Sequence, residues 1–234
     1  MTGRAVIRGI LFDSGHTLIH PRDDEWFPGH RFRAIVGEHC SDDLTWDRLE
    51  DGLSRGMAYL DAVHSLQSVE EEREQFIEYY RLVLAAMGQM SPTPELLLAL
   101  ASSLVDELAV DLYPDVVPTL QTLRARGLKL GIVSDSWPSL DPKYVQLGVR
   151  HYFDAFVISA QLGCVKPDER MYRRGLTDLA LAPEEVLFID DWPGHVEAAM
   201  ALGMHGAVMD RMDIRKSGGL PQVTSMADVL VLLD

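Results

Sequence analysis

Residues 186–204 of this 234-residue chain are VLFIDDWPGHVEAAMALGM, a stretch that combines an apolar run, two aspartates and a helical segment. Val186–Ile189 is a short apolar run of the kind that forms a strand buried on both faces. Asp190 and Asp191 follow this run, and Val196–Leu202 has the composition of the next helix. A buried strand followed by a helix is the repeating unit of a parallel α/β sheet, and ligands bind where such strands end.

Other apolar runs have the same form and alternate with helical stretches. We expect strands at Val6–Phe12, Leu128–Val133, Ala155–Ile158 and Gly206–Met209. Helices are expected over Val116–Arg126, which Gly127 ends, and from the capping residue Asp168 to Leu179. This alternation predicts an α/β fold with a parallel sheet.

Residues 22–112 interrupt the alternation. Ser68 and Glu71 have capping-box spacing before a helix, and Thr93 with the following proline opens an apolar helix that is expected to run through Leu108. About 90 residues of helix therefore separate the first strand from the rest of the sheet. This pattern predicts an inserted helical domain.

The predicted division is a core of residues 1–21 and 113–234 with a helical insertion of residues 22–112. Within the insertion, the charge run Glu70–Glu74 is most simply a solvated helix face.

The composition limits the partners. A net charge of −15 supplies no general field for a phosphate backbone or an anionic membrane surface, so we expect neither nucleic acid nor membrane binding. The N-terminus lacks a signal-length apolar core, and the cytoplasm is the expected location. Cys40 and Cys164 are far apart and form no metal-ligand pattern, and we expect no disulfide between them. An acidic chain that binds a small anion needs a local device such as a metal or a lysine.

Polar side chains at several predicted strand ends could form that device. Asp13, Ser134 and the pair Asp190 and Asp191 each follow an apolar run, and Lys166 lies on a loop before a helix. Singly, each residue has an ordinary explanation as a turn cap or a surface charge. Together, the carboxylates could hold Mg²⁺, and the lysine and the hydroxyl could bind the oxygens of a phosphoryl group.

At these residues the chain resembles the haloacid dehalogenase-like hydrolase superfamily, in its helical-cap (C1-type) subgroup. The four ordered motifs of that family are matched by IRGILFDSGHTLIH at residues 7–20, LKLGIVSDS at 128–136, GCVKPDERMY at 163–172 and VLFIDDWPGHVEAAMALGM at 186–204. The resemblance covers nearly the whole chain. It implies a Rossmann-like parallel sheet core with helices on both faces and an inserted all-helical cap domain over residues 22–112.

The resemblance also implies roles for the site residues. Asp13 would attack phosphorus and form an aspartyl-phosphate. The side chains of Asp13, Asp190 and Asp191 and the backbone carbonyl of Gly15 would bind Mg²⁺. Ser134, Lys166, Thr17 and Asp135 would bind or orient the phosphoryl group of a small phosphorylated metabolite, and Lys166 would also offset charge near Asp13.

Gly15 departs from the family pattern, which has a second aspartate at this position. Glycine keeps the backbone carbonyl but removes the side chain that protonates the leaving group and activates water. General acid–base catalysis contributes roughly 10² to 10⁴ in rate. Three alternatives follow: a substrate with a good leaving group such as an acyl phosphate, a replacement acid such as His16 or His20, or a protein that binds a phosphorylated ligand with little turnover.

Three further residues, each close in sequence to one of the candidate site residues, have two interpretations each. His16, where the family pattern has glycine, could donate a proton or face the cap. Asp135 could contact substrate or cap a turn. His195 is expected to be a helix-start residue rather than a ligand.

The leading hypothesis is an Mg²⁺-dependent phosphatase of a small metabolite. A non-enzymatic, regulatory phospho-ligand-binding protein is the first alternative, favoured only by Gly15. A 2-haloacid dehalogenase-like hydrolase is the second, and it ranks lower because the retained pair of Asp190 and Asp191 has little use in a metal-free site. Phosphonate cleavage needs a Schiff-base lysine from the cap, yet residues 21–109 contain no lysine.

Overall fold

The computed structural model describes residues 6–23, 25–39, 44–63, 65–212 and 217–234. The chain forms two compact units, which we call the core unit (residues 1–20, 111–136 and 140–234) and the helical unit (residues 21–110 and 137–139). The division into a catalytic core of residues 1–21 and 113–234 and a cap domain of residues 22–112 stays a prediction. Cys40 lies outside the described residues, and Cys164 is buried as a free thiol.

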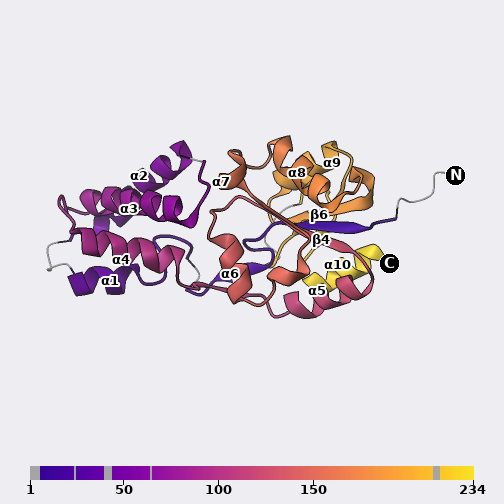
Figure 1. Cartoon of the computed structure of the whole chain (residues 1–234), viewed down its shortest axis with the longest axis horizontal. Helices are drawn as coiled ribbons and strands as arrows, with labels where there is room; N and C mark the ends of the chain where they lie inside the picture. Colours follow the sequence, from indigo (N-terminus) through magenta and orange to yellow (C-terminus); the bar gives the residue numbers. More distant parts are fainter. Residues whose placement is uncertain (1–5, 24, 40–43, 64, 213–216) are drawn as a thin grey trace. The chain divides into compact units, whose positions relative to one another are not determined.

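The core unit contains a parallel six-stranded sheet, as the alternation of strands and helices predicts (Figure 1). Its strand order is β5 (Ala155–Ile158), β4 (Lys129–Ser134), β1 (Gly9–Phe12), β6 (Val186–Asp190), β7 (His205–Met209) and β8 (Gln222–Val223). Strand β8, at the edge, was not predicted. Every pairing is parallel, and β1 lies between β4 and β6. The sheet order therefore reverses direction at β1, which is where an open α/β sheet binds its ligands.

Helices lie on both faces of this sheet, with α8 and α9 on one face and α5 and α10 on the other (Figure 1). The core helices are α5 (Val116–Ala125), α6 (Leu140–Gln146), α7 (Ser159–Leu162), α8 (Glu169–Leu179), α9 (Pro193–Ala201) and α10 (Met226–Leu233), with 3₁₀ turns at Arg150–Tyr152 and Pro183–Glu185. Two predicted helix boundaries are confirmed. The Asp168 side chain caps α8 by accepting a hydrogen bond from the Arg170 N–H, and Gly127 follows the end of α5 with a φ of 80°.

Two glycines allow Leu11 of β1 to fill the interior of the core unit. A Cβ atom on Gly131 of β4 would lie 2.7 Å from one methyl group of Leu11, and a Cβ atom on Gly175 of α8 would lie 2.8 Å from the other. Both distances are shorter than carbon atoms tolerate. The close packing of α8 on β1 and β4 fixes the strand that ends at Asp13.

The helical unit contains α1 (Phe32–His39), a 3₁₀ turn at Trp46–Arg48, α2 (Leu49–Ala62), α3 (Val69–Ala86) and α4 (Pro94–Val105). Ser68 caps α3 and Thr93 caps α4 as predicted, although α4 ends at Val105 rather than Leu108. Aromatic residues of α3, including Phe76, pack in the core of this unit with apolar side chains of α1, α2 and α4.

The charge run Glu70–Glu74 is not uniformly solvated, and this part of the sequence interpretation was wrong. Glu72 is 2% exposed. Its carboxylate accepts hydrogen bonds from the Ser139 N–H at 2.7 Å and the Ser139 hydroxyl at 2.6 Å. Local charge patterning could not reveal this, because the segment Trp137–Ser139 that covers Glu72 lies more than 60 residues away in the sequence.

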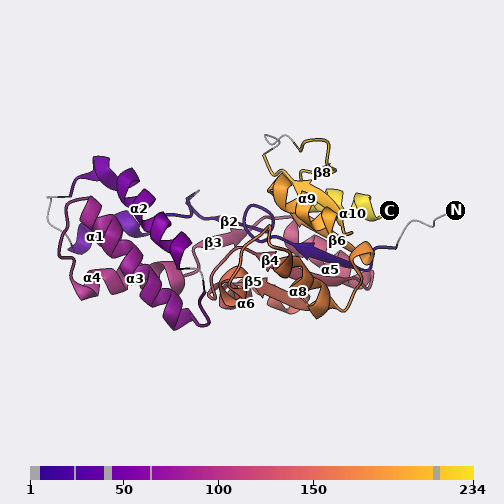
Figure 2. The same cartoon turned by 90° about the horizontal axis from the view of Figure 1, so that it is seen from above.

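A second, two-stranded sheet pairs β2 (Ile19–Pro21) with β3 (Val110–Leu112), and both strands are labelled in Figure 2. Both strands are three residues long, too short to leave a period-2 signal in the sequence. Within the described ranges, the helices are all too short or too polar to cross a membrane.

Candidate active site

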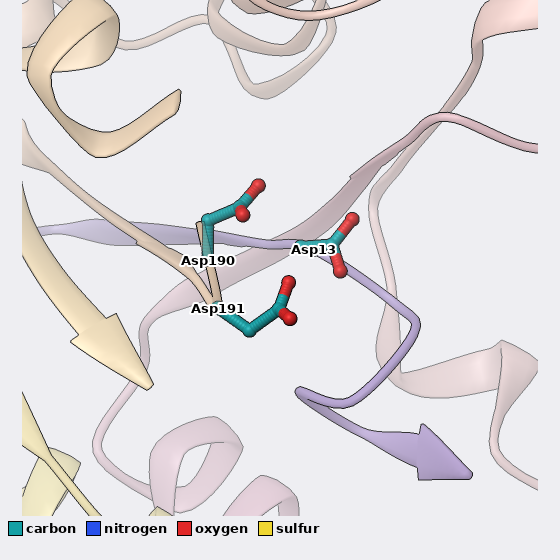
Figure 3. Close-up of side chains that lie close together, drawn as sticks. All are labelled: Asp13, Asp190 and Asp191. Carbon is teal, nitrogen blue, oxygen red and sulfur yellow. The ribbon is translucent and has the colours of Figure 1, made fainter. Parts of the chain in front are cut away.

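Three carboxylates gather where the neighbouring strands β1 and β6 end. Asp13 follows the last residue of β1, Asp190 is the last residue of β6 and Asp191 comes next. One oxygen from each carboxylate lies within 4.8 Å of the others, and Figure 3 shows the three side chains together. Asp13 and Asp190 are buried, and Asp191 is partly exposed. The strand register explains the cluster, because Phe12 pairs with Ile189 and the next residue of each strand carries a carboxylate.

Lys166 joins two of these carboxylates. Its Nζ atom lies 2.6 Å from Asp13 Oδ1 and 2.6 Å from Asp190 Oδ2. The Lys166 side chain is 2% exposed. Its loop is held by a hydrogen bond of 2.9 Å from the Lys166 N–H to Asp135 Oδ1. Asp135 therefore binds the lysine loop, an interaction that neither of its two sequence interpretations includes.

Burial and charge set the protonation of this cluster. Burial raises the pKa of Asp13 to about 7, with Asp190 and Asp191 adding to the rise and Lys166 opposing it. Burial also disfavours the ionised form of Asp190, but Lys166 and a hydrogen bond from His195 outweigh it and hold the Asp190 pKa below its usual range. For Lys166, burial disfavours the charge, yet Asp13 and Asp190 raise its pKa well above the ordinary value. Lys166 is thus a permanent cation, and Asp13 is the carboxyl group that takes up the first proton.

His195 lies in the first turn of α9, as expected for a helix-start residue, but its ring also reaches the site. The Nδ1 atom is 3.2 Å from both Asp190 oxygens. The Trp192 N–H donates to Asp190 Oδ1 at 2.7 Å. Asp190 is therefore oriented from Lys166 on one side and from the start of α9 on the other.

The loop after β1 is a compact turn, which we call the nucleophile loop (residues 13–18). Ser14 O accepts from the N–H groups of Leu18 and Ile19, and the His16 N–H donates to Ile19 O. The Ser14 hydroxyl shares a hydrogen bond of 2.7 Å with the buried hydroxyl of Tyr144, in α6. The backbone of this loop is thus fixed at both ends, with Gly15 and His16 at its tip.

His16 adopts a left-handed backbone conformation with a φ of 54°. This conformation costs a residue with a Cβ atom roughly 1–2 kcal/mol relative to glycine. Glycine also makes the unfolded chain more flexible, which offsets about 0.4–1 kcal/mol of that gain in stability. We therefore expect His16→Gly to stabilise the protein by about 0.5–1 kcal/mol in urea unfolding at an unchanged m-value. Ala180 has a φ of 50° at the end of α8, and Ala180→Gly is the matched control remote from the site. If His16→Gly loses stability while Ala180→Gly does not, the contacts of the His16 side chain contribute more to the free energy of unfolding than the backbone strain costs.

The remaining predicted residues lie around the cluster. Ser134 ends β4 next to β1 and is 3% exposed. Thr17 is completely buried, and its hydroxyl has no hydrogen-bond partner in the part of the chain that the structure describes. Its backbone carbonyl accepts from Arg211 instead. Arg211 and Tyr144 are contacts of the nucleophile loop that motif spacing did not identify, because both belong to segments outside the four motifs.

The carboxylate cluster suits a divalent cation. Three carboxylates gather in a mostly buried position, and Lys166 bridges two of them, Asp13 and Asp190. All the side-chain donors are carboxylate oxygens, which Mg²⁺ prefers over nitrogen or sulfur. Burial and the neighbouring carboxylates raise the pKa of Asp13, and a cation held among the three would oppose that rise.

Comparison with known proteins agrees with the motifs and the fold. The family model of haloacid dehalogenase-like hydrolases matches residues 7–203. A glyceraldehyde 3-phosphate phosphatase of Methanopyrus kandleri is 28% identical over 190 residues, which cover 80% of this chain and 76% of that protein. The match to the family model spans most of the chain and includes all four motifs.

Solved structures share the fold at low sequence identity. A 2-haloacid dehalogenase of Pseudomonas syringae superposes with a TM-score of 0.70 at 18% identity, covering 97% of this chain and 98% of the other. A magnesium-bound hydrolase of Bacillus subtilis superposes with a TM-score of 0.69 at 15% identity, covering 98% and 99%. At these identities the likeness concerns the fold. The sheet, the ordered motifs and the family match together show that this chain belongs to the haloacid dehalogenase-like hydrolases.

Proposed function

We propose that the protein is an Mg²⁺-dependent hydrolase that removes a phosphoryl group from a small metabolite through an aspartyl-phosphate on Asp13. The observation that carries this proposal is the gathering of Asp13, Asp190 and Asp191 within 4.8 Å of one another, with Lys166 bonded to Asp13 and Asp190. A divalent cation would give all three carboxylates a role in one site, which a metal-free reaction does not. The phosphatase named among the relatives supports a small phosphorylated substrate.

The chemistry follows from the positions of the side chains. An oxygen of Asp13 attacks phosphorus, and the new O–P bond forms as the bond to the leaving oxygen breaks. Water then attacks the same phosphorus, releases inorganic phosphate and restores the Asp13 carboxylate. Lys166 keeps Asp13 oriented and stabilises the equatorial oxygens, with the Ser134 hydroxyl at the end of the adjacent strand as a second donor. Bound Mg²⁺ would neutralise charge between the carboxylates and the phosphoryl group.

Gly15 selects among substrates in this scheme. No side chain at this position can protonate the leaving oxygen, so departure as a stable anion is favoured. Acyl phosphates, and esters with acidic leaving groups, meet this requirement without a general acid. We therefore propose a substrate with a good leaving group ahead of simple alkyl phosphates.

Hydrolysis of two probes tests the proposal. Acetyl phosphate and p-nitrophenyl phosphate should both be turned over with Mg²⁺, and the activity should disappear with EDTA and return when Mg²⁺ is added in excess. No metal-dependent turnover of either probe, together with binding of phosphate and Mg²⁺ in calorimetry, would favour the non-enzymatic, ligand-binding alternative.

The dehalogenase alternative makes the opposite prediction about metal. If Asp13 attacked carbon, 2-chloropropionate would release chloride at the same rate with Mg²⁺ and with EDTA. We expect no chloride release under either condition, because three clustered carboxylates suit a phosphoryl transfer that a cation assists rather than an attack on carbon.

The pKa of Asp13 predicts how Mg²⁺ binding depends on pH. Because burial raises this pKa to about 7, metal binding must displace a proton below that pH. The apparent Mg²⁺ affinity should therefore be about ten-fold weaker at pH 6 than at pH 8. Titration calorimetry in buffers of different ionisation enthalpy should detect the released proton at pH 6.

Asp13→Asn is the control for this measurement, since an amide cannot titrate. The variant should bind Mg²⁺ more weakly and with little change between pH 6 and pH 8. An affinity of the wild-type protein that is constant over this range would contradict the assignment of the titrating group.

A further inference from the structure

Arg211 lies beyond the four motifs, two residues after the end of β7, and its guanidinium reaches the nucleophile loop. Nε and Nη2 donate to the backbone carbonyl of Thr17 at 3.2 and 2.7 Å. The Arg211 side chain is 9% exposed. Its charge is therefore placed almost completely inside the core unit and directed at a neutral backbone acceptor two residues from Gly15.

Two groups hold the guanidinium in place. Nη1 donates to both oxygens of Asp115, at 2.9 and 2.7 Å, and the guanidinium carbon lies 4.1 Å from the centre of the Tyr113 ring. Asp115 is anchored in turn, because its Oδ2 also accepts from the Met226 N–H at the start of α10. The planar fork of arginine satisfies the carbonyl and the carboxylate at once, which a lysine cannot do.

The other contacts of the loop explain why this carbonyl matters. The Thr17 hydroxyl has no partner among the described residues, so it does not fix the turn. The neighbouring Leu18 carbonyl accepts from the Tyr113 N–H at 3.1 Å, from the same segment that packs on Arg211. The end of the turn is therefore held through backbone carbonyls, by groups that come from outside the motif.

We propose that Arg211 is a positioning residue, which sets the nucleophile loop so that Asp13 and the Gly15 carbonyl keep their places in the site. The inference rests on the proposed function, in which Asp13 is the nucleophile. The contact of Arg211 with the loop is to the Thr17 carbonyl, and its effect on Asp13 passes through the loop backbone. Loss of the fork releases the Thr17 carbonyl and widens the range of Asp13 positions.

Arg150 supplies a matched control within the core unit. It also pairs with an aspartate (Asp141, 2.8 Å), donates to a backbone carbonyl (Phe153, 3.0 Å) and covers an aromatic ring (Phe156, 4.5 Å). Its carbonyl partner is not in the nucleophile loop, and its side chain is more exposed, at 32% against 9% for Arg211. Arg150→Ala thus controls for the loss of a partly buried arginine with three kinds of contact.

The experiment compares Arg211→Ala, Arg211→Lys and Arg150→Ala by kinetics on acetyl phosphate with Mg²⁺. Both Arg211 variants should lose roughly 10- to 100-fold in kcat while KM changes less than about three-fold, since misplacement of about 1 Å costs this much in rate. Arg150→Ala should keep the kcat of the wild-type protein. Millimolar guanidinium should restore part of the kcat of Arg211→Ala in a saturable manner, and it should have no such effect on Arg150→Ala.

Hydrogen exchange separates failure of this inference from failure of the proposed function. Amides of residues 14–19 should exchange at least ten-fold faster in the Arg211 variants and at the wild-type rate in Arg150→Ala, whether or not the protein turns over substrate. An inactive wild-type protein would overturn the proposed function alone. Unchanged kcat and unchanged loop exchange in the Arg211 variants would overturn the positioning role, as would equal losses in the Arg150 control. If Arg211→Ala does not fold, Arg211→Lys and Asp115→Asn carry the same comparison.

Discussion

Asp13→Asn is expected to abolish phosphate release from acetyl phosphate and p-nitrophenyl phosphate, with a loss on the order of 10⁴-fold or more in kcat, as for other removed nucleophiles. An amide keeps the shape of the side chain but cannot attack phosphorus. Asp13 is buried, lies 2.6 Å from Lys166 and belongs to the carboxylate cluster, and no other described member of that cluster follows β1. The remaining carboxylates cannot take over its position.

The same variant should be more stable than the wild-type protein when metal is absent at pH 8. Burial raises the Asp13 pKa from 3.8 to about 7, so the ionised wild-type group opposes folding above pH 7 and this opposition fades as the pH falls. Asparagine removes a cost of roughly 2–4 kcal/mol at pH 8, while Lys166 keeps Asp190 as its partner. Thermal unfolding of both proteins at pH 8 and pH 5, with EDTA, measures the difference.

These two results together exclude a trivial explanation of lost activity. An inactive Asp13→Asn that unfolds at a higher temperature than the wild-type protein at pH 8 has lost chemistry and kept its fold. A variant that retains turnover within ten-fold of wild type would show that the nucleophile is another group. A variant less stable at pH 8 than at pH 5, relative to wild type, would contradict the raised pKa.

Gly15→Asp is expected to increase the hydrolysis of alkyl phosphates, with little change for acyl phosphates. A carboxylic acid at this position supplies the proton that a poor leaving group needs, and the ratio of the two activities should shift by roughly 10²-fold, within the range for general acid–base catalysis. The backbone permits the change, because the described residues with positive φ do not include Gly15.

Gly15→Asn is the matched control, since it has the size of aspartate and no acidic proton. The ratio of alkyl to acyl phosphate hydrolysis should rise in Gly15→Asp and stay at the wild-type value in Gly15→Asn. Equal ratios in all three proteins, each shown to be folded, would mean that leaving-group protonation does not limit the rate. A higher ratio in both variants would indicate a change of loop shape rather than of acid catalysis.

The sequence was sufficient to predict the sheet and the position of the candidate site, because both depend on local patterns. Apolar runs such as Val186–Ile189 mark buried strands, and in a parallel sheet the residues after neighbouring strands meet at one edge. These patterns therefore predict that Asp13 and Asp190 lie close together. Their separation in the sequence is immaterial once β1 and β6 are adjacent.

The contacts that hold this site could not be predicted in the same way. Arg211 meets Thr17, and Tyr144 meets Ser14, across separations of more than 100 residues, and no periodicity links such pairs. The prediction that Glu72 belongs to a solvated face was wrong for the same reason. The segment that buries Glu72 comes from a different part of the chain. Charge and hydrophobic patterns report the neighbours along the chain, whereas these groups are fixed by tertiary contacts.

Chemical trapping of the intermediate tests the central claim most directly. Protein turning over acetyl phosphate with Mg²⁺ is quenched with borohydride, which reduces an acyl phosphate of aspartate to homoserine, and the peptide containing residue 13 is sequenced by mass spectrometry. We expect homoserine at position 13, dependent on Mg²⁺ and on substrate. Metal-dependent turnover with unmodified Asp13, or with homoserine at Asp190 or Asp191 instead, would contradict the account.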